Sequence, residues 1–267
     1  MKREVQIFFT ALMFYTRIPI PKGIQFKKEY SKASVKYLPL IGLLVGGVSA
    51  VILILLLTIL PVSIAVTVSF ISSLLLTGAF HEDGLADTVD GFGGGWNKEK
   101  ILLIMKDSTI GAYGAIALVM ALLLKFQLLV ALVDLPMANG IPTYYFILFV
   151  SLAGHSISRV LAVSVMITHQ YARINDGTSK LKSITPEGLK WTSPAFLLAL
   201  TFALFPLFLF QTSYVFLLLF PIYLVRVLLV RFFNKWIGGY TGDCLGAIQQ
   251  ISEIIFYLSI FILWKYI

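Results

Sequence analysis

Carboxylates gather in one short stretch of an otherwise apolar chain. Six of the 13 acidic residues lie between positions 82 and 107, although 58% of the chain is hydrophobic. Packed carboxylates repel one another unless cations neutralise them. Magnesium prefers oxygen ligands, so the stretch predicts a site for one or two Mg²⁺ ions. The candidate metal ligands are Glu82, Asp83, Asp87, Asp90 and Asp107.

The spacing within this stretch is helical. If 82–90 forms a helix, Asp83, Asp87 and Asp90 share one face and Glu82 lies beside it. Carboxylates on one stripe can hold divalent cations that activate an attacking oxygen and stabilise a leaving phosphate oxygen. His81 is a candidate general base, metal ligand or cap. The sequence does not separate ligand from base, so all of these except Glu82 are also candidate catalytic residues.

Glycines surround the acidic residues. Gly84, Gly91 and the run 93–95 allow close backbone approach, as a phosphate or nucleotide requires. We therefore predict that Gly93 and Gly94 contact substrate. The alternative is a solvated acidic loop, but such loops usually mix Lys and Ser among the acids and do not space Asp at helical intervals.

A second motif follows at 105–114. Lys106 could contact a phosphate as a point charge, which makes it a candidate catalytic residue. Asp107 could complete the metal site, and Ser108 is a candidate substrate contact. The alternative is that Asp107 or Ser108 caps the N-terminus of the next span.

Three further polar residues are candidate substrate contacts. Asp243 is the only acid in the loop 231–244, and the alternative is that it caps the following span. Arg173 is either an anion ligand or a marker of the basic side of the membrane. Arg159 lies four residues after His155 within an apolar run, where it needs a partner or an aqueous cavity, so structural pairing and phosphate contact both remain open.

Composition defines the elements that must position these residues. The mean hydropathy of +0.90 and 13% charged residues indicate a membrane protein, because about 25% charged is usual for soluble domains. We predict one all-α, polytopic membrane-embedded domain over 1–267, with apolar runs approaching the ~20 residues that cross a bilayer. These seven predicted spans are 38–60, 62–80, 110–133, 143–168, 194–210, 213–230 and 245–264.

The segment from Val5 to Pro21 is too short for a span and is predicted to be an interfacial or partly inserted helix, ended by Pro19 and Pro21. It is not a secretory signal peptide, because its apolar run is short and no clear cleavage site follows. Arg17 in this segment is either a substrate contact or a lipid-facing anchor.

The basic residues predict the topology. Seventeen of the 21 Lys and Arg residues fall in the N-terminal segment and in alternate connections. The positive-inside rule then places the N-terminus and the long loops in the cytoplasm and the C-terminus outside. Because they flank spans, these residues indicate contact with the lipid bilayer and not with nucleic acid.

All motif-bearing connections share that cytoplasmic side, which favours an enzyme at the membrane surface over a transporter. A transporter with intramembrane Lys125, Arg159 and Arg226 is the least favoured alternative. The lone Cys244 forms no internal disulfide and is expected to be a small packing residue.

Five groups of residues along nearly the whole chain resemble motifs of the bacterial cobalamin synthase family, also called adenosylcobinamide-GDP ribazoletransferase. The acidic run from His81 to Gly91 carries the resemblance, together with 104–111. Further matches along the chain are Thr16-Arg17-Ile18-Pro19, Pro39-Leu40-Ile41-Gly42, Arg159 with Tyr171-Ala172-Arg173, and Thr241-Gly242-Asp243 with Leu245-Gly246-Ala247.

The resemblance implies a Mg²⁺-dependent phosphotransferase for substituted phosphate groups. It would join adenosylcobinamide-GDP to α-ribazole, or to its 5′-phosphate, and release GMP in the last steps of cobalamin assembly. The ribazole hydroxyl would attack the cobinamide-linked phosphorus. The partners are these small molecules and the bilayer, and whether the chain forms a homo-oligomer stays open.

The element Asp87-x-x-Asp90-Gly91 also resembles the CDP-alcohol phosphotransferases, which likewise cleave a nucleotide diphosphate linkage at a membrane face. The arginine of that family's pattern is absent here, so it is the second choice. Release of CMP in place of GMP would identify it.

Overall fold

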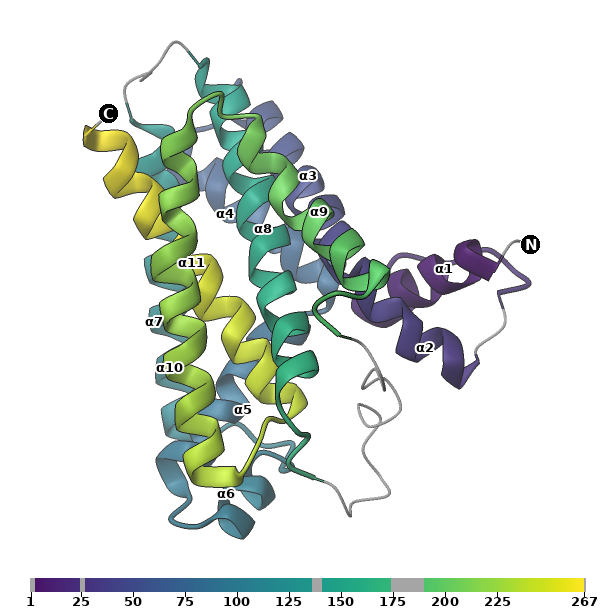
Figure 1. The fold of residues 1–267 in the computed structure, drawn as a ribbon. Helices are drawn as coiled ribbons and strands as arrows, with labels where there is room; N and C mark the ends of the chain where they lie inside the picture. The colour runs from purple at the N-terminus through teal and green to yellow at the C-terminus, as the bar shows by residue number, and fades with distance from the viewer. Residues whose placement is uncertain (1–2, 25–26, 136–140, 174–189, 267) are drawn as a thin grey trace.

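The computed structural model describes residues 3–24, 27–135, 141–173 and 190–266, and these form a bundle of helices (Figure 1). Within the described residues there is no strand, only an isolated bridge between Tyr171 and Tyr240, so the all-α prediction is confirmed. The helices are α1 (Arg3–Tyr15), α2 (Lys28–Ser34), η1 (Val35–Tyr37), α3 (Leu38–Leu56), α4 (Val62–Thr77), α5 (Phe80–Gly94), α6 (Lys98–Ile104), α7 (Ala112–Val133), α8 (Thr143–Thr168), α9 (Pro194–Phe208), η4 (Ser213–Leu218), α10 (Leu219–Ile237) and α11 (Gly242–Tyr266).

Each of the seven predicted spans is an apolar helical segment, but their lengths differ. Five segments are long and apolar enough to cross a membrane: 28–56, 112–133, 143–168, 213–237 and 242–266. The bent pair α4–α5 supplies a sixth candidate, whereas α9 has only 15 residues. The prediction of a polytopic helical membrane protein is confirmed, but the described residues contain five helices that could cross a membrane, or six with the bent pair, where the sequence predicted seven spans.

A sharp bend separates α4 from α5. Gly78 and Ala79 both adopt positive φ, at 68° and 55°, and the two helices meet at 86°. Because α4 carries no charged residue and α5 carries four acidic ones, we assign the spanning segment to α4 and place α5 beyond it. The stretch 81–94 was expected in a connection between spans. It is instead a helix that packs against α11 and α7 at one end of the bundle (Figure 1).

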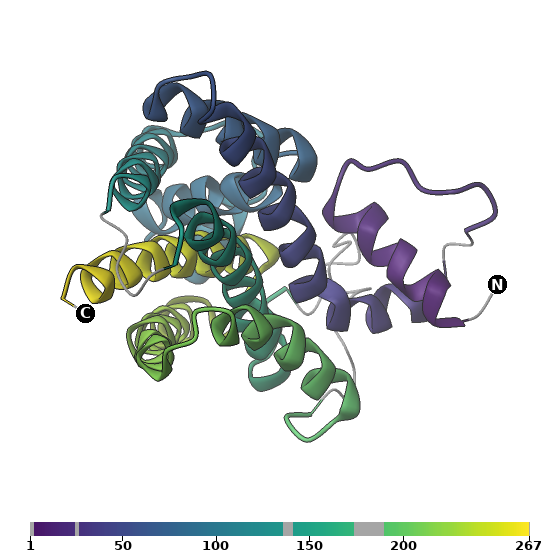
Figure 2. The same ribbon diagram turned by 90° about the horizontal axis from the view of Figure 1, so that it is seen from above.

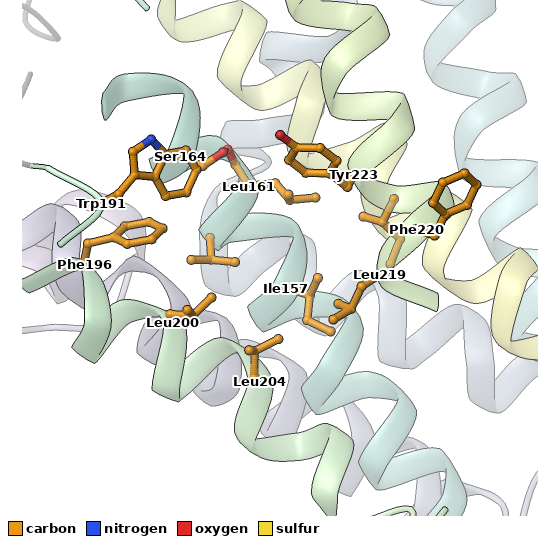
Figure 3. Close-up of a pocket in the computed structure, with 12 residues that line it drawn as sticks. Ile157, Leu161, Ser164, Trp191, Phe196, Leu200, Leu204, Leu219, Phe220 and Tyr223 are labelled. Carbon is orange, nitrogen blue, oxygen red and sulfur yellow. The ribbon is translucent and has the colours of Figure 1, made fainter. Parts of the chain in front are cut away.

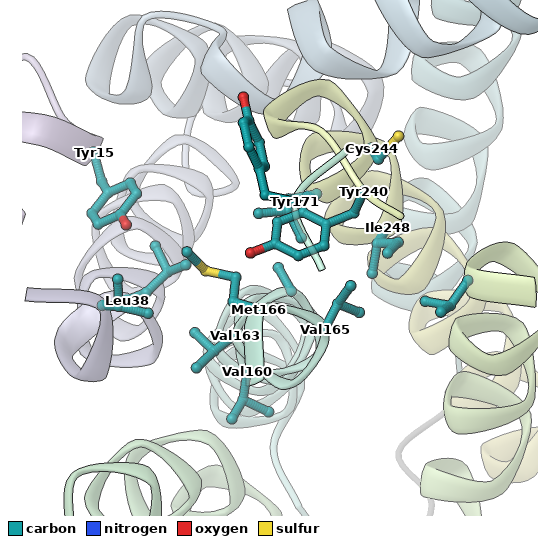
Figure 4. Packing of buried hydrophobic residues seen from close by; sticks show 14 of the residues in the cluster. Tyr15, Leu38, Val160, Val163, Val165, Met166, Tyr171, Tyr240, Cys244 and Ile248 are labelled. Atoms are coloured by element: carbon teal, nitrogen blue, oxygen red, sulfur yellow. The ribbon is translucent and has the colours of Figure 1, made fainter. Parts of the chain in front are cut away.

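Helix α8 is the centre of the bundle. Most of its residues are buried, and it packs against α3, α9 and α11. Val160, Val163 and Met166 on α8 meet Tyr15, Tyr171 and Tyr240 in one apolar cluster (Figure 4). Cys244 lies buried in the same cluster, as a small packing residue.

Helices α1 and α2 lie to one side of the bundle (Figure 2). The α1 helix buries Ile7, Ala11 and Leu12, which confirms a helix before the first span. After α1 ends at Tyr15, the chain is tied to the end of α4, because the Arg17 amide donates to the Leu76 carbonyl at 2.7 Å. An added Cβ at Gly78 would collide with the Arg17 guanidinium, so Arg17 lies over the α4–α5 bend.

Candidate functional site

The site is built where α5 crosses α11. Gly84 on α5 faces Gly246 on α11, and a Cβ added at Gly246 would lie 3.1 Å from the Gly84 Cα and 3.0 Å from the His81 carbonyl oxygen. A Cβ added at Gly84 would lie 3.1 Å from the Asp243 carbonyl oxygen. Small residues at both positions let the two backbones approach closely. This contact brings the acidic stripe of α5 to the first turn of α11.

Three carboxylates and one guanidinium form what we call the acidic face: Asp83, Asp87, Asp243 and Arg173. Asp83 is exposed, whereas Asp87, Asp243 and Arg173 are partly buried. Arg173 Nη2 donates to Asp243 Oδ2 at 3.3 Å, and Thr241 Oγ1 donates to the same oxygen at 3.2 Å. Three anions with one cation at an accessible surface leave an excess of negative charge.

Arg173 reaches the acidic face through backbone pairing. The Ala172 amide donates to the Tyr240 carbonyl at 2.9 Å, and the Tyr240 amide donates to the Gln170 carbonyl at 3.0 Å. The two motifs around 171 and 240, separate in the sequence, are therefore one element in space. This pairing holds Arg173 beside the first turn of α11. The remainder of the predicted 169–193 connection, at 174–189, lies outside the described residues.

The carboxylates of the acidic face affect one another's charge. The pKa of Asp87 is raised to about 7, first by partial burial and then by the charges of Asp243, Asp83 and Asp90, while the charge of Arg173 lowers it. A carboxyl that titrates near neutrality can accept a proton at physiological pH. The same repulsion would be relieved by a bound cation.

Asp90 has a structural role that the sequence did not show. Its carboxylate accepts from the Gly111 amide at 2.7 Å and from the Gly114 amide at 2.8 Å, which caps the N-terminus of α7. The N-cap alternative proposed for Asp107 or Ser108 is thus filled by Asp90. Asp107 is exposed instead, and its Oδ1 accepts from the Thr109 amide and hydroxyl in a local turn.

At α11, too, the capping residue differs from the one that the sequence suggested. The sequence left open that Asp243 caps this helix, but Thr241 Oγ1 accepts from the Cys244 amide at 3.2 Å. The Asp243 side chain is therefore free of capping and faces Arg173. Because Thr241 caps the helix, the Asp243 carboxylate is available to bind a ligand at the site.

The glycines after Asp90 serve helix packing. A Cβ at Gly91 would lie 2.6 Å from the Met105 side chain, one at Gly93 2.7 Å from the Tyr113 ring, and one at Gly95 2.5 Å from Ile101. Gly94 faces Ile104. Their smallness is explained by these neighbours, so close approach of a phosphate is not needed to account for them. Substrate contact at Gly93 and Gly94 stays a prediction.

A second group of charges lies inside the bundle and was not predicted as a unit. We call it the buried polar network. Glu253, fully buried on α11, contacts Lys125 on α7 at 2.6 Å and His155 on α8 at 3.4 Å. Gln249 Nε2 and the Tyr257 hydroxyl also donate to Glu253. The network members are Glu82, Lys125, His155, Arg159, Gln249, Gln250, Glu253 and Tyr257.

The network extends to α5. Gln250 Nε2 donates to Gln249 Oε1 at 2.8 Å and to Glu82 Oε1 at 2.7 Å. Glu82 therefore faces the bundle interior and not the acidic face. His81 is also buried, and its charged neighbours include Arg159 and Glu253. The structure thus places Glu82, a predicted metal ligand, in the network and His81, a predicted catalytic residue, inside the bundle near its charges.

The remaining candidates lie in three places. Arg159 is 2% exposed, and its Nη1 donates to the His155 carbonyl at 2.8 Å, which favours structural pairing over phosphate contact. Lys106 and Ser108 are exposed at the turn between α6 and α7. Arg17 is exposed at the α4–α5 bend. Their contact with substrate stays a prediction.

The acidic face suits a hard divalent cation in its donor chemistry. Its ligands are oxygens, and the charges of the neighbouring carboxylates help to raise the pKa of Asp87. No group of three or more His, Cys, Asp or Glu side chains within the described ranges is arranged to hold a metal ion by itself. Mg²⁺ commonly binds through one or two carboxylates plus substrate phosphates, so a closed protein cage is not required.

The fold and the acidic face define a polytopic helical membrane protein with a carboxylate-rich site at one end of its bundle. The family model described as cobalamin-5-phosphate synthase matches residues 7–261. The chain belongs to this family.

Curated relatives agree along the whole chain. A protein of Shewanella frigidimarina (strain NCIMB 400) is 45% identical over 259 residues, covering 97% of this chain and 95% of its own length. A protein of Shewanella amazonensis is 42% identical over 267 residues, covering 99% and 98%. Both are called adenosylcobinamide-GDP ribazoletransferase. No solved structure matches the chain.

Proposed function

We propose that this protein is a Mg²⁺-dependent transferase that joins adenosylcobinamide-GDP to α-ribazole, or to its 5′-phosphate, with release of GMP. Family membership supports the reaction class. The observation that carries the proposal is the meeting of Asp83, Asp87, Asp243 and Arg173, which come from three separate motifs, on one accessible face.

Charge explains how this face would bind a pyrophosphate donor. Asp83 and Asp243, together with substrate phosphates, would hold Mg²⁺, which when bound neutralises phosphate charge and stabilises a leaving phosphate oxygen. Arg173 is oriented by Asp243 and can present further N–H donors to a phosphate oxygen. The face thus combines anions for the metal with a cation for the phosphates.

The chemical step exchanges one phosphorus–oxygen bond for another. The ribazole hydroxyl oxygen bonds to the cobinamide-linked phosphorus, and the bond from that phosphorus to the bridging oxygen of GMP breaks. The hydroxyl proton must leave. We assign its acceptance to Asp87, which is partly buried on the acidic face, and not to His81, which is 5% exposed inside the bundle.

We further propose that the acidic face opens to the cytoplasm of a bacterial cell, in its cytoplasmic membrane. The support is the distribution of Lys and Arg, 17 of 21 of which flank the spans on the side of the motifs. The N-terminus would share that side. A fluorescent reporter that matures only in the cytoplasm should then be bright when fused to the N-terminus and dark when fused after Ile267.

The test is GMP release by the purified full-length protein in detergent, given adenosylcobinamide-GDP, α-ribazole and Mg²⁺. We expect release by the wild type, and its loss with chelator or with Asp87→Asn. Glu99→Gln is the matched control, because Glu99 is an exposed acid on α6 that is not one of the candidate site residues. Wild-type protein that is well folded and releases no GMP would overturn the proposal, and release of CMP from a CDP-linked donor would replace it with the second choice.

A further inference from the structure

An apolar pocket lies between α8, α9 and α10, in the part of the bundle that no motif occupies. Its volume is about 400 Å³. Helix α9 contributes Phe196, Leu200 and Leu204, and α10 contributes Leu219 and Tyr223. At its rim Trp191 is 46% exposed and Phe220 is 75% exposed. The pocket therefore opens to the surroundings of the spans, where lipid chains lie.

The two ends of the pocket differ in chemistry. Figure 3 shows Trp191, Ser164 and Tyr223, each with a polar atom, at one end, and Leu204 and Leu219 toward the other. Tryptophan and tyrosine are enriched where a bilayer meets water. This arrangement matches an amphiphile, whose polar part would lie at the Trp191 end and whose chain would lie along α9 and α10.

A buried cation lies at the polar end. Arg226 on α10 is 6% exposed and contacts two pocket residues: its Nε donates to Ser164 Oγ at 3.2 Å, and its guanidinium lies over the Tyr223 ring at 5.8 Å. It also donates to Thr168 Oγ1 at 2.6 Å and to the Ser164 carbonyl at 3.4 Å. All these acceptors are neutral.

An uncompensated charge inside a span is costly. No carboxylate of a described residue lies within salt-bridge distance of Arg226, whereas Lys125, also within a span, has Glu253. Buried charges are normally paired, and the five N–H donors of a guanidinium exceed the hydrogen bonds made here. Arg226 is therefore suited to an anion that the described part of the chain does not supply.

We propose that this pocket binds one anionic phospholipid, with an acyl chain between α9 and α10 and its phosphate on Arg226. The lipid would satisfy two needs at once, since the chain fills apolar volume and the phosphate neutralises the cation. Basic pockets between transmembrane helices are known to hold lipid headgroups. The site is separate from the acidic face and does not depend on the proposed reaction.

The test is native mass spectrometry of the full-length protein with phosphatidylglycerol, or with diacylglycerol of the same chains, added to the detergent. We expect one phosphatidylglycerol to be retained, and Arg226→Gln to weaken its binding about tenfold, because a charge-assisted hydrogen bond is lost. Leu200→Trp, which fills the pocket, should abolish retention. Arg226→Lys should keep more binding than Arg226→Gln, since the charge remains.

Matched controls separate the site from the general lipid surface. Arg231→Gln removes an exposed cation from the same helix, and Leu197→Trp enlarges a residue that is 52% exposed on α9 outside the pocket. Both should bind like wild type. Equal retention of diacylglycerol and phosphatidylglycerol, unchanged binding by Arg226→Gln, or retention of only detergent or α-ribazole would overturn the proposal. A single elution peak in size-exclusion chromatography checks that each variant is folded.

Discussion

The acidic face and the buried polar network are both rich in charge, and they balance it differently. The acidic face has three carboxylates and one guanidinium, and part of it is open to solvent. The network pairs Glu253 with Lys125 and joins Glu82 to Gln250 by a hydrogen bond, and every member is buried. Excess negative charge at a surface favours binding of a cation. Paired charges inside a bundle instead hold the helices that carry them in one arrangement, because separating the partners is costly. Glu82 and Gln250 connect the two regions through α5 and α11.

The largest contrast should come from removing one carboxylate of the acidic face. We expect Asp83→Asn to lower the rate of GMP release about a hundredfold or more, because metal charge stabilisation is worth several kcal/mol and each ~1.4 kcal/mol is tenfold. Its thermal stability should be unchanged or higher, since a like charge is lost. If Asp83→Asn loses as much free energy of unfolding as it loses in activation free energy, then Asp83 stabilises the fold and does not bind the metal.

Removing a carboxylate of the buried polar network should have the reverse result. Glu253→Gln leaves Lys125 buried without its partner, and we expect a loss of about 3–5 kcal/mol in the free energy of unfolding. Thermal unfolding in detergent, followed by intrinsic fluorescence, measures it. The double substitution Lys125→Met with Glu253→Met should recover most of the loss, because both charges are removed. If Glu253→Gln unfolds like wild type, the network does not stabilise the bundle.

The sequence predicted part of the acidic face, because the spacing of residues within one helix can be seen in the sequence whereas contacts between distant helices cannot. The i, i+4 spacing of Asp83 and Asp87 identified one helical face, and α5 has that helix. Asp90 continues the same spacing, yet its role depends on Gly111 and Gly114, about one helix further along the chain. The sequence does not show which distant amide a carboxylate will reach.

The buried polar network was missed although a signal for it existed. Glu253 is an acid in an apolar run, and acids within spans are costly enough to indicate a partner. Lys125 and Arg159 were noticed singly, because pairing between α7, α8 and α11 is a property of the bundle and not of any one helix. The contact between Gly84 and Gly246 was missed for the same reason, since 162 positions separate the two glycines.

A smaller perturbation tests whether the α5–α11 contact links the two regions. A Cβ in Gly246→Ala would lie 3.0 Å from the His81 carbonyl oxygen, so α5 must move by a few tenths of an ångström. We expect a stability cost of about 1–3 kcal/mol and a roughly tenfold lower rate, because the acidic face is displaced. Gly47→Ala is the control, as its Cβ would meet only Leu152 at an ordinary 3.6 Å. Loss of stability without loss of rate would separate the contact from the site.

Asp90 belongs to neither region and should behave as a cap of α7. Asp90→Asn keeps the shape but loses the charge and one of two acceptors at the start of α7, for an expected cost of about 1 kcal/mol. Asp107→Asn, at an exposed turn, should be near neutral. If Asp90→Asn lowers the rate as much as Asp83→Asn and keeps its stability, then Asp90 is a metal ligand, as the sequence predicted.

The smallest expected effect is a pH dependence of stability that only the acidic face should show. The folded pKa of Asp87 is about 7, well above the ordinary value of 3.8, so the folded state binds this proton more tightly than the unfolded state does. The resulting stabilisation is complete below the unfolded pKa and is lost as the pH rises through about 7. In chelator, the melting temperature should therefore rise when the pH falls from 8 to 6. Asp87→Asn should remove this part of the pH dependence, and a slope equal to that of wild type would show that burial and the neighbouring charges do not raise the pKa of Asp87 as the structure indicates.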